Sequence, residues 1–273
     1  MWCEDISGDE LLLLWLSGIV GFLGVGKWTK VNFLKMPGGR RAFRPILNGA
    51  LVFGFACLYL SLRSWSDPVV RDSPCYITIL MAWSVAGLTV SSLAFPYLGI
   101  SLRFDCVAGN NLSAAYSLGG ALLGLMLIHC GSNIGRGPSL WNNVFSAVAG
   151  TFVWLALWLM VEYSTRVSLA VTEERDAASG LRLGSFLCAE GLILGRAVAG
   201  DWESMSSTIV DLLRDGWFGL GLAVMAIVFE KRLQPRRGNP FPNWLKNGLS
   251  PGAAYLACSG LVLVLLGKWK THS

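Results

Sequence analysis

Eight long apolar stretches constrain the fold of this chain more than any other feature of its sequence. A helix needs about 20 apolar residues to cross the hydrocarbon core of a bilayer, and none of the stretches alternates apolar and polar residues as a strand would. A spanning segment must also satisfy its own backbone hydrogen bonds, which favours helices. The sequence therefore predicts an all-α, polytopic transmembrane helical bundle of about eight spans, at 11–26, 46–62, 76–94, 111–131, 140–161, 177–200, 216–229 and 252–267.

The composition agrees with a membrane protein and excludes several other classes. Only 14% of the 273 residues are charged, whereas a soluble domain usually carries about 25%. Eight spans would use roughly 160 residues, so the loops and tails leave no room for a soluble catalytic domain. A disordered chain and a nucleic-acid-binding domain are excluded. The protein is expected to act in the bilayer, at its surfaces or through partners.

Two of the predicted spans have an alternative interpretation. The first follows residues 1–10, which contain acidic but no basic side chains. A cleavable signal peptide needs a basic n-region, so this stretch is expected to be a retained span. The seventh is short and follows Asp211, Arg214 and Asp215, so it either extends back to Ser207 or leaves a chain of seven spans.

Basic residues predict the orientation of the chain. The segment 27–44 holds six basic residues and no acidic one, and the segment 231–246 holds five basic residues. Basic loops favour the cytoplasmic side, so both segments are expected in the cytoplasm and the N-terminus outside. The same segments would attract anionic lipids of the inner leaflet. The predicted lipid-headgroup contacts are Arg40, Arg41, Arg44, Arg236 and Arg237.

A shift of 65 residues aligns the fourth predicted span with the sixth, so that Leu118-Gly119 meets Leu183-Gly184. The spans that follow them also align at their ends, which predicts two copies of one helical hairpin. Each copy contains two spans, so the copies are parallel and differ from the inverted repeats of many transporters. The second span is a candidate third copy. The predicted regions are an N-terminal three-span region at 1–100, copy 1 at 101–165, copy 2 at 166–232, and a basic loop with the last span at 233–273.

Each copy opens with a polar residue before an apolar, glycine-bearing helix. The first reads NNLSAA at 110–115, ahead of Gly119-Gly120, and the second reads RDAA at 175–178, ahead of Gly184. Over residues 101–232 this pattern resembles a family of uncharacterised bacterial inner-membrane proteins built from a duplicated two-helix unit. The chain departs from that pattern in having Asp176 in place of Asn and in its three additional N-terminal spans. The resemblance implies a bacterial inner (plasma) membrane location and this architecture, and it implies no biochemical activity.

Glycines recur at a spacing of four residues in the two aligned helices. Small residues at this spacing let two helix backbones approach closely. The fourth and sixth spans are therefore expected to pack tightly, and a glycine-lined conduction path is the alternative. The glycines assigned to helix packing are Gly120, Gly124, Gly184, Gly191 and Gly195.

Ionisable side chains inside a span are candidate functional residues, because placing a charge in the bilayer costs free energy. Arg182 and Arg196 lie near the ends of the sixth span, where long side chains can reach an interface. Glu190 lies near mid-membrane and must be protonated, paired with another helix or facing water. It is about 80° around the helix and about 12 Å along it from Arg182, so the two are not expected to pair directly. The ion- or proton-handling candidates are Glu190, Arg182, Arg196 and, in the fourth span, His129.

Asn111 and Asp176 occupy the positions where helix N-caps are expected. Capping is one interpretation of this pair, and a repeated polar entrance to a pore is the other. Glu162 and Glu230, at the aligned ends of the second helices, leave the same alternatives open.

The chain carries no nucleophile elbow, paired-carboxylate motif or metal-ligand spacing, so no enzymatic activity, cofactor or metal is expected. Its seven cysteines form no CxxC pair and are predicted to be packed thiols. Two functional classes remain. One is a non-catalytic structural or assembly component that packs into a larger membrane complex, or into a homo-oligomer, through its glycine faces. The other is an ion or small-solute channel or transporter that uses Glu190.

Overall fold

The computed structural model describes residues 7–33, 42–137, 139–201, 204–235 and 243–267. Helices make up almost all of this part of the chain, and eight of them are long and apolar enough to cross a membrane. The all-α polytopic fold predicted from the sequence is thus confirmed, and the protein is a multi-pass membrane protein. The elements are α1 (Gly8–Phe33), α2 (Phe43–Ser64), α3 (Pro68–Asp72), α4 (Pro74–Ser91), η1 (Ser92–Leu98), η2 (Leu102–Ala108), α5 (Leu112–Gly131), α6 (Leu140–Thr165), α7 (Val167–Thr172), α8 (Ala177–Ala197), α9 (Met205–Leu233), η3 (Leu245–Leu249) and α10 (Ser250–Leu266).

The seventh span is a long helix, which confirms the extension back toward Ser207 and corrects the short span at 216–229. It begins at Met205 and ends at Leu233. Ser204 and Ser207 form a reciprocal capping box at its start, which satisfies backbone N–H groups that a helix end otherwise leaves without partners. Asp211, between the cap and the apolar stretch, lies inside the helix. The seven-span alternative is wrong because charged residues in the first turns of this helix were read as a loop.

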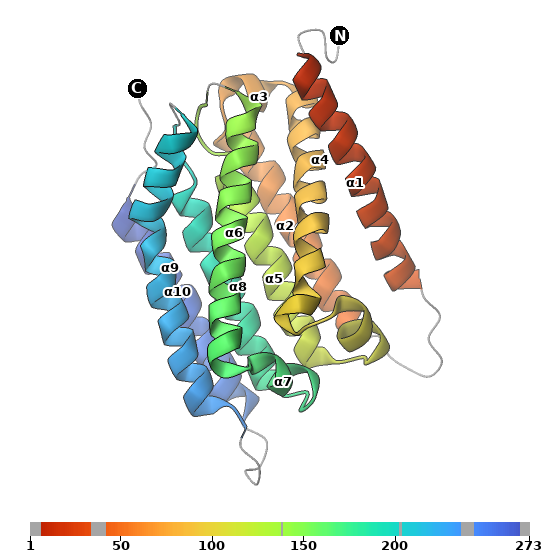
Figure 1. Ribbon diagram of the computed structural model, residues 1–273, viewed down its shortest axis with the longest axis vertical. Helices are drawn as coiled ribbons and strands as arrows, with labels where there is room; N and C mark the ends of the chain where they lie inside the picture. The colour runs from red at the N-terminus through yellow and green to blue at the C-terminus, as the bar shows by residue number, and fades with distance from the viewer. Residues whose placement is uncertain (1–6, 34–41, 138, 202–203, 236–242, 268–273) are drawn as a thin grey trace.

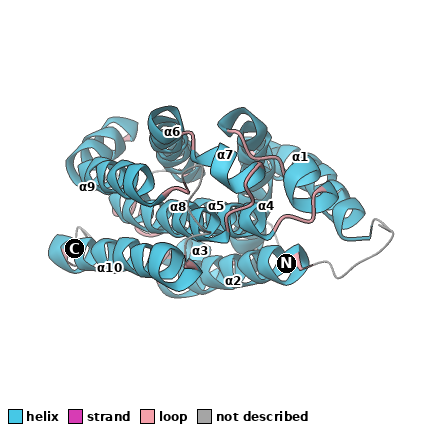
Figure 2. Ribbon diagram, turned by 90° about the horizontal axis from the view of Figure 1, so that it is seen from below, coloured by secondary structure: helices cyan, strands magenta, loops and turns pink. Residues whose placement is uncertain are grey.

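The helices form three layers, which Figure 2 shows from below. The pair α5 and α8 lies in the middle layer, with α6 and α9 over one face and α2 and α10 over the other. Helix α4 extends the middle layer, and α1 packs on α4 at the edge of the bundle. Because α5 and α8 have protein on both faces, they are the most buried of the spans.

The helices alternate in direction, so the chain begins and ends at the same end of the bundle (Figure 1). Helices α1 and α9 finish, and α2 begins, at the opposite end. We call this opposite end the basic end and the other the N-terminal end. The described basic side chains at the basic end include Lys27, Lys30, Arg44, Lys231 and Arg232.

Glycines let α5 and α8 approach each other to backbone contact. A methyl group added to Gly120 would overlap the carbonyl oxygen of Gly184, and one added to Gly131 would overlap the carbonyl oxygen of Gly195. Gly191 packs on the backbone of Gly124 in the same way. No other residue type permits this approach, because every other side chain begins with a Cβ. The glycine faces of the two helices therefore cover each other inside the bundle.

Two cysteines depart from the prediction of packed thiols: Cys75, and Cys258, whose free thiol is exposed. Cys75, at the start of α4, is disulfide-bonded. Among the described cysteines the remaining five are free thiols, and Cys3 lies outside the described residues. The prediction was wrong for Cys75 because cysteine spacing alone does not reveal which cysteines are bridged.

Candidate functional site: buried charges along helix α8

Helix α8 carries three ionisable side chains into the most enclosed part of the bundle. Its sequence interrupts an apolar pattern with Arg182, Glu190 and Arg196, and all three are buried. Arg182 lies toward the basic end, Glu190 near the middle and Arg196 toward the N-terminal end. A charge in such surroundings is stable only if other groups offset its lost hydration. The surroundings of each side chain therefore decide its role.

Arg182 is paired with Glu230, near the end of α9. Its Nε donates to Oε1 at 2.7 Å and its Nη2 donates to Oε2 at 2.8 Å, so the guanidinium grips both oxygens of the carboxylate. Arg182 is 0% exposed and Glu230 is 2% exposed. Two parallel, charge-assisted hydrogen bonds are the geometry in which an arginine holds a carboxylate most strongly. The expectation that Arg182 reaches an interface is wrong, because its charge is offset inside the bundle.

The pair belongs to a longer polar network at the basic end. Arg182 Nη2 also donates to the hydroxyl of Ser179 at 2.8 Å, and that hydroxyl donates to Asp176 Oδ2 at 2.7 Å. Arg182 Nη1 donates to the backbone carbonyl of Asn247, which precedes α10. One guanidinium thus joins the starts of α8 and α10 to the end of α9. This arrangement fixes helix positions.

Glu190 lies against α9 without a hydrogen-bonding partner among the described residues. It is 0% exposed, and neither carboxyl oxygen is hydrogen-bonded. Its Oε1 occupies the space where Gly219 would carry a side chain, with Leu157 of α6 beside it. An unpaired carboxylate in such a place would be very costly, so the neutral, protonated acid is the form these surroundings favour. The sequence left three states open for Glu190: protonated, paired with another helix, or facing water. Among the described residues Glu190 has no partner on another helix, and it is not exposed.

Arg196 and His129 lie at the other end of the bundle, on different helices. Arg196 is 5% exposed, and its Nη2 lies 3.4 Å from the backbone carbonyl of Leu266, the last residue of α10. His129 is buried between α5 and α4: a methyl group on Gly87 would lie 2.6 Å from its Cε1. Its ring is 6.4 Å from that of Trp83. His129 faces α4 and Glu190 faces α9, so the structure does not bring these two candidates together.

Asn111 and Asp176 cap the two central helices. Asn111 Oδ1 accepts from the backbone N–H groups of Ser113 and Ala114, and Asp176 accepts from those of Ala178 and Ser179. Both capping residues are buried. The Asn111 amide also donates to the carbonyl of Val171 at 2.7 Å. Each side chain is thus engaged in ordering a helix start, which is the capping role.

The predicted headgroup residues fall mostly outside the described part of the chain, which leaves out Arg40, Arg41, Arg236 and Arg237. Arg44 is described, in the first turn of α2 at the basic end. It is partly buried, and its Nε and Nη2 have no hydrogen-bond partner within the described structure. Its position agrees with the predicted headgroup contact.

Sequence reasoning missed the partner of Arg182. Arg182 and Glu230 are 48 residues apart and belong to different helices, so no local periodicity connects them. The available signal was the alignment of Glu230 with Glu162, which placed Glu230 at the basic end, where Arg182 also lies. Among the described residues no group of three His, Cys, Asp or Glu side chains could hold a metal ion.

Comparisons with known proteins add no identification. No family model, no curated protein and no solved structure matches this chain. The function must therefore be argued from the site and the surfaces described above.

Proposed function

We propose that the protein is a non-catalytic structural component of a membrane complex. One observation carries this proposal: a groove runs along the outer face of α1, and none of the described residues occupies it. It encloses about 430 Å³ around Gly18, between large apolar side chains that include Trp15, Ile19 and Phe22. A small residue flanked by large ones is the surface that a second transmembrane helix packs against.

The partner surface differs from the one expected from the sequence. The glycines of α5 and α8 pack on each other, so those faces are not available to another subunit. Gly18 of α1 has no other residue within 4 Å of its missing side chain. A helix of another subunit can therefore approach the backbone of α1 closely at Gly18, as α5 and α8 approach each other at their glycines.

The buried ion pair of α8 and α9 favours a structural role over a transport role. Arg182 and Glu230 neutralise each other and join α8 to α9 and to the residues before α10. Such a network resists the relative movement of helices that alternating access requires. A core joined by backbone-contact glycines and an enclosed ion pair is suited to holding other subunits in place.

Co-purification tests the proposal through Gly18. Gly18→Val should remove a subunit that otherwise co-purifies with the tagged protein in fixed stoichiometry, and it should leave the thermal unfolding midpoint in detergent unchanged. Gly260→Val on α10, whose missing side chain also meets nothing within 4 Å, is the matched control and should retain the subunit. A native protein that purifies alone from gently solubilised membranes would contradict the proposal.

A channel or transporter remains the second candidate function because of Glu190. Its two carboxyl oxygens are buried without hydrogen-bond partners among the described residues. An ionisable group kept at such a cost inside a span is a candidate for proton or cation handling. Flux of protons or Na⁺ into vesicles that contain the purified protein tests this candidate. Flux that is present in the native protein and lost in Glu190→Gln would favour it over the structural role.

We also propose that the chain is oriented with its basic end in the cytoplasm of a bacterium and that it belongs with the duplicated two-helix proteins it resembles. The bonded cysteine supports the orientation, because Cys75 lies at the N-terminal end and disulfides persist in oxidising compartments outside the cytoplasm. The matching caps at Asn111 and Asp176 support the duplication. Labelling of single-cysteine variants by a membrane-impermeant maleimide in intact cells tests the orientation.

A further inference from the structure

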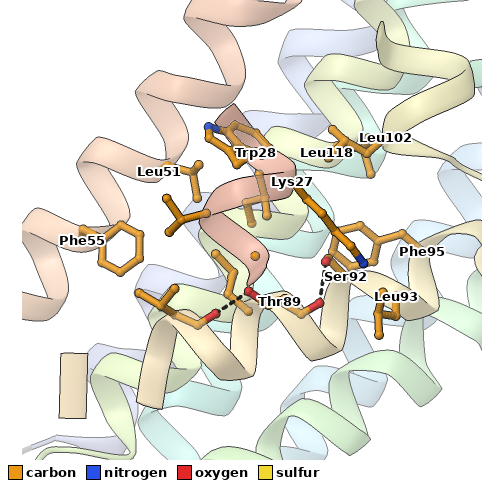
Figure 3. A pocket seen from close by; sticks show the side chains of 15 residues that line it. Lys27, Trp28, Leu51, Phe55, Thr89, Ser92, Leu93, Phe95, Leu102 and Leu118 are labelled. Carbon is orange, nitrogen blue, oxygen red and sulfur yellow. Dashed lines mark hydrogen bonds between the residues drawn. The ribbon is translucent and has the colours of Figure 1, made fainter. Parts of the chain in front are cut away.

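A cavity of about 270 Å³ lies between α1, α2, α4 and α5 at the basic end of the bundle (Figure 3). It is larger than the ~150 Å³ apolar cavity that is known to hold a benzene molecule in an engineered protein. Its walls are almost entirely apolar. The main contributors are Leu51, Phe55, Leu88, Phe95, Leu118 and Leu122.

The cavity exists because α1 touches the bundle at separate points. Two glycines bring α1 close to α4: Gly24 packs on Thr89, and Gly21 lies where a side chain would meet Val85 at 3.2 Å. One turn further on, the indole of Trp28 donates to Asn48 of α2 at 3.2 Å. Helix α1 is therefore tied to α4 and then to α2, and the space between these ties is left unfilled. The cavity is a built feature of the fold.

The two hydroxyl groups that line the cavity lie one turn apart, at the end of α4 and the start of η1. The hydroxyl of Thr89 donates to the carbonyl of Val85 at 2.8 Å, and that of Ser92 donates to the carbonyl of Thr89 at 2.7 Å. Both donors are thus engaged by the helix. Lys27 is the charged residue among those that line the cavity, and Figure 3 shows its side chain extending toward Ser92. An occupant would meet a long apolar wall and one ammonium group.

We propose that this cavity binds one anionic lipid, with an acyl chain inside and the acidic headgroup on Lys27. The apolar walls fit a hydrocarbon chain, and they offer few hydrogen bonds to a polar ligand. Lys27 lies in the last two turns of α1, at the basic end of the bundle, and the segment 27–44 has no acidic residue to compete for the ammonium. A lysine binds a phosphate as a point charge. The site does not depend on whether the protein is structural or a transporter.

Lipid titration of the purified protein, read by native mass spectrometry, tests the headgroup part of the proposal. Phosphatidylglycerol and phosphatidylcholine with identical acyl chains are the two probes. The native protein should bind one phosphatidylglycerol about fivefold more tightly than phosphatidylcholine, the preference expected for one basic residue near an anionic headgroup. Lys27→Gln should abolish the preference. Lys30→Gln removes the same charge from a lysine that does not line the cavity and should keep it.

Filling the cavity tests the acyl-chain part. Leu51→Trp would place a large side chain in the cavity and should remove the tight site for both lipids. Val52→Trp is the matched control, since Val52 is an exposed neighbour on α2 that does not line the cavity. Thermal unfolding without added lipid checks that both variants are folded. Equal affinity for the two lipids, an unchanged preference in Lys27→Gln, or an unchanged site in a folded Leu51→Trp would each overturn the proposal.

Discussion

The hairpin of α5 and α6 and the hairpin of α8 and α9 begin in the same way. Each first helix has a buried, side-chain N-cap, and the residue before the cap has a positive φ in both: 45° at Asn110 and 54° at Arg175. After each first helix comes a glycine with a positive φ, Gly135 at 107° and Gly200 at 144°. At φ values as large as those of Gly135 and Gly200, only glycine avoids strain. The two hairpins thus share their starting turns and the turns that end their first helices.

Inside the membrane the two hairpins differ in charge. At the shift of 65 residues, Ser117 stands where the second hairpin has Arg182, and Leu125 stands where it has Glu190. Glu162, the counterpart of Glu230, accepts from the hydroxyl of Ser168 at 2.6 Å. A buried ionisable side chain is thus accommodated in two ways. Arg182 has an opposite charge beside it, whereas Glu190 has only the space left by a glycine.

The largest expected effect comes from breaking the pair that distinguishes the second hairpin. Arg182→Ala leaves Glu230 buried without its partner, and loss of one member of such a pair typically costs ~3–5 kcal/mol. The thermal unfolding midpoint in detergent should fall accordingly. Ser117→Ala, the matched change in the first hairpin, should lower the midpoint far less. The double variant Arg182→Met with Glu230→Gln should recover part of the loss, and an unchanged midpoint in Arg182→Ala would contradict the pairing.

The surface on which the two hairpins meet is the next target. Gly184→Val places a branched side chain against the backbone carbonyl of Tyr116. Overpacking of this kind typically costs ~1–3 kcal/mol, which should appear as a lower unfolding midpoint. Gly221→Val on α9 is the control, because a side chain there meets nothing within 4 Å. Equal midpoints for the two variants would show that the close contact of α5 and α8 is wrong.

Exchange of the mid-membrane residues sharpens the comparison. Glu190→Leu gives the second hairpin the residue of the first, and removal of a buried, unsatisfied polar group should stabilise the protein by ~1–3 kcal/mol. Leu125→Glu makes the reverse change and should destabilise it, since Leu125 is fully buried. Chemical denaturation of both variants in mixed micelles measures the two effects. If Glu190→Leu unfolds more readily than the native protein, Glu190 has a stabilising partner that the described residues do not include.

The caps should give a smaller and more equal effect. Asn111→Ala and Asp176→Ala each remove hydrogen bonds to two backbone N–H groups, and loss of a cap costs ~1 kcal/mol. Asn111→Asp keeps the acceptor but loses the donor to Val171, so it should be less stable than the native protein although it reproduces the cap of the second hairpin. Thermal unfolding of the three variants should show similar losses for Asn111→Ala and Asp176→Ala, and a midpoint for Asn111→Asp below that of the native protein.

The smallest effect is expected before α5, at Cys106, which aligns with the buried Val171. Burial, with a contribution from the charge of Asp105, raises the pKa of the Cys106 thiol to about 12. The thiol should therefore stay protonated and unreactive toward maleimide at pH 8 until the protein unfolds. Cys106→Val should leave the unfolding midpoint almost unchanged, because it nearly conserves volume. Labelling of Cys106 in the folded protein would show that this segment is open.

Span positions were predictable from the sequence because an apolar stretch of sufficient length has few alternatives to a membrane helix. The caps at Asn111 and Asp176 were predictable for a similar reason, since they depend on residues two and three positions away. The start of α9 was predictable in part: the extension back to Ser207 comes within two residues of the observed start at Met205, whereas the charges at 211–215 also allowed a loop. The partner of Arg182 was missed, since Glu230 lies 48 residues away along the chain. The bond of Cys75 was missed because cysteine spacing does not reveal a bridge.

The sequence by itself determined that this protein crosses a membrane with about eight helices, where its basic residues gather and which helices carry closely spaced glycines. These are local properties, which depend on residue type and spacing. Only the tertiary structure decided that the glycine faces cover each other, that Arg182 grips Glu230, that Glu190 lies in the space above Gly219, and that α1 leaves a cavity beside Lys27. Each of these results from how helices pack side by side, and packing joins residues whose separation along the chain carries no periodic signal.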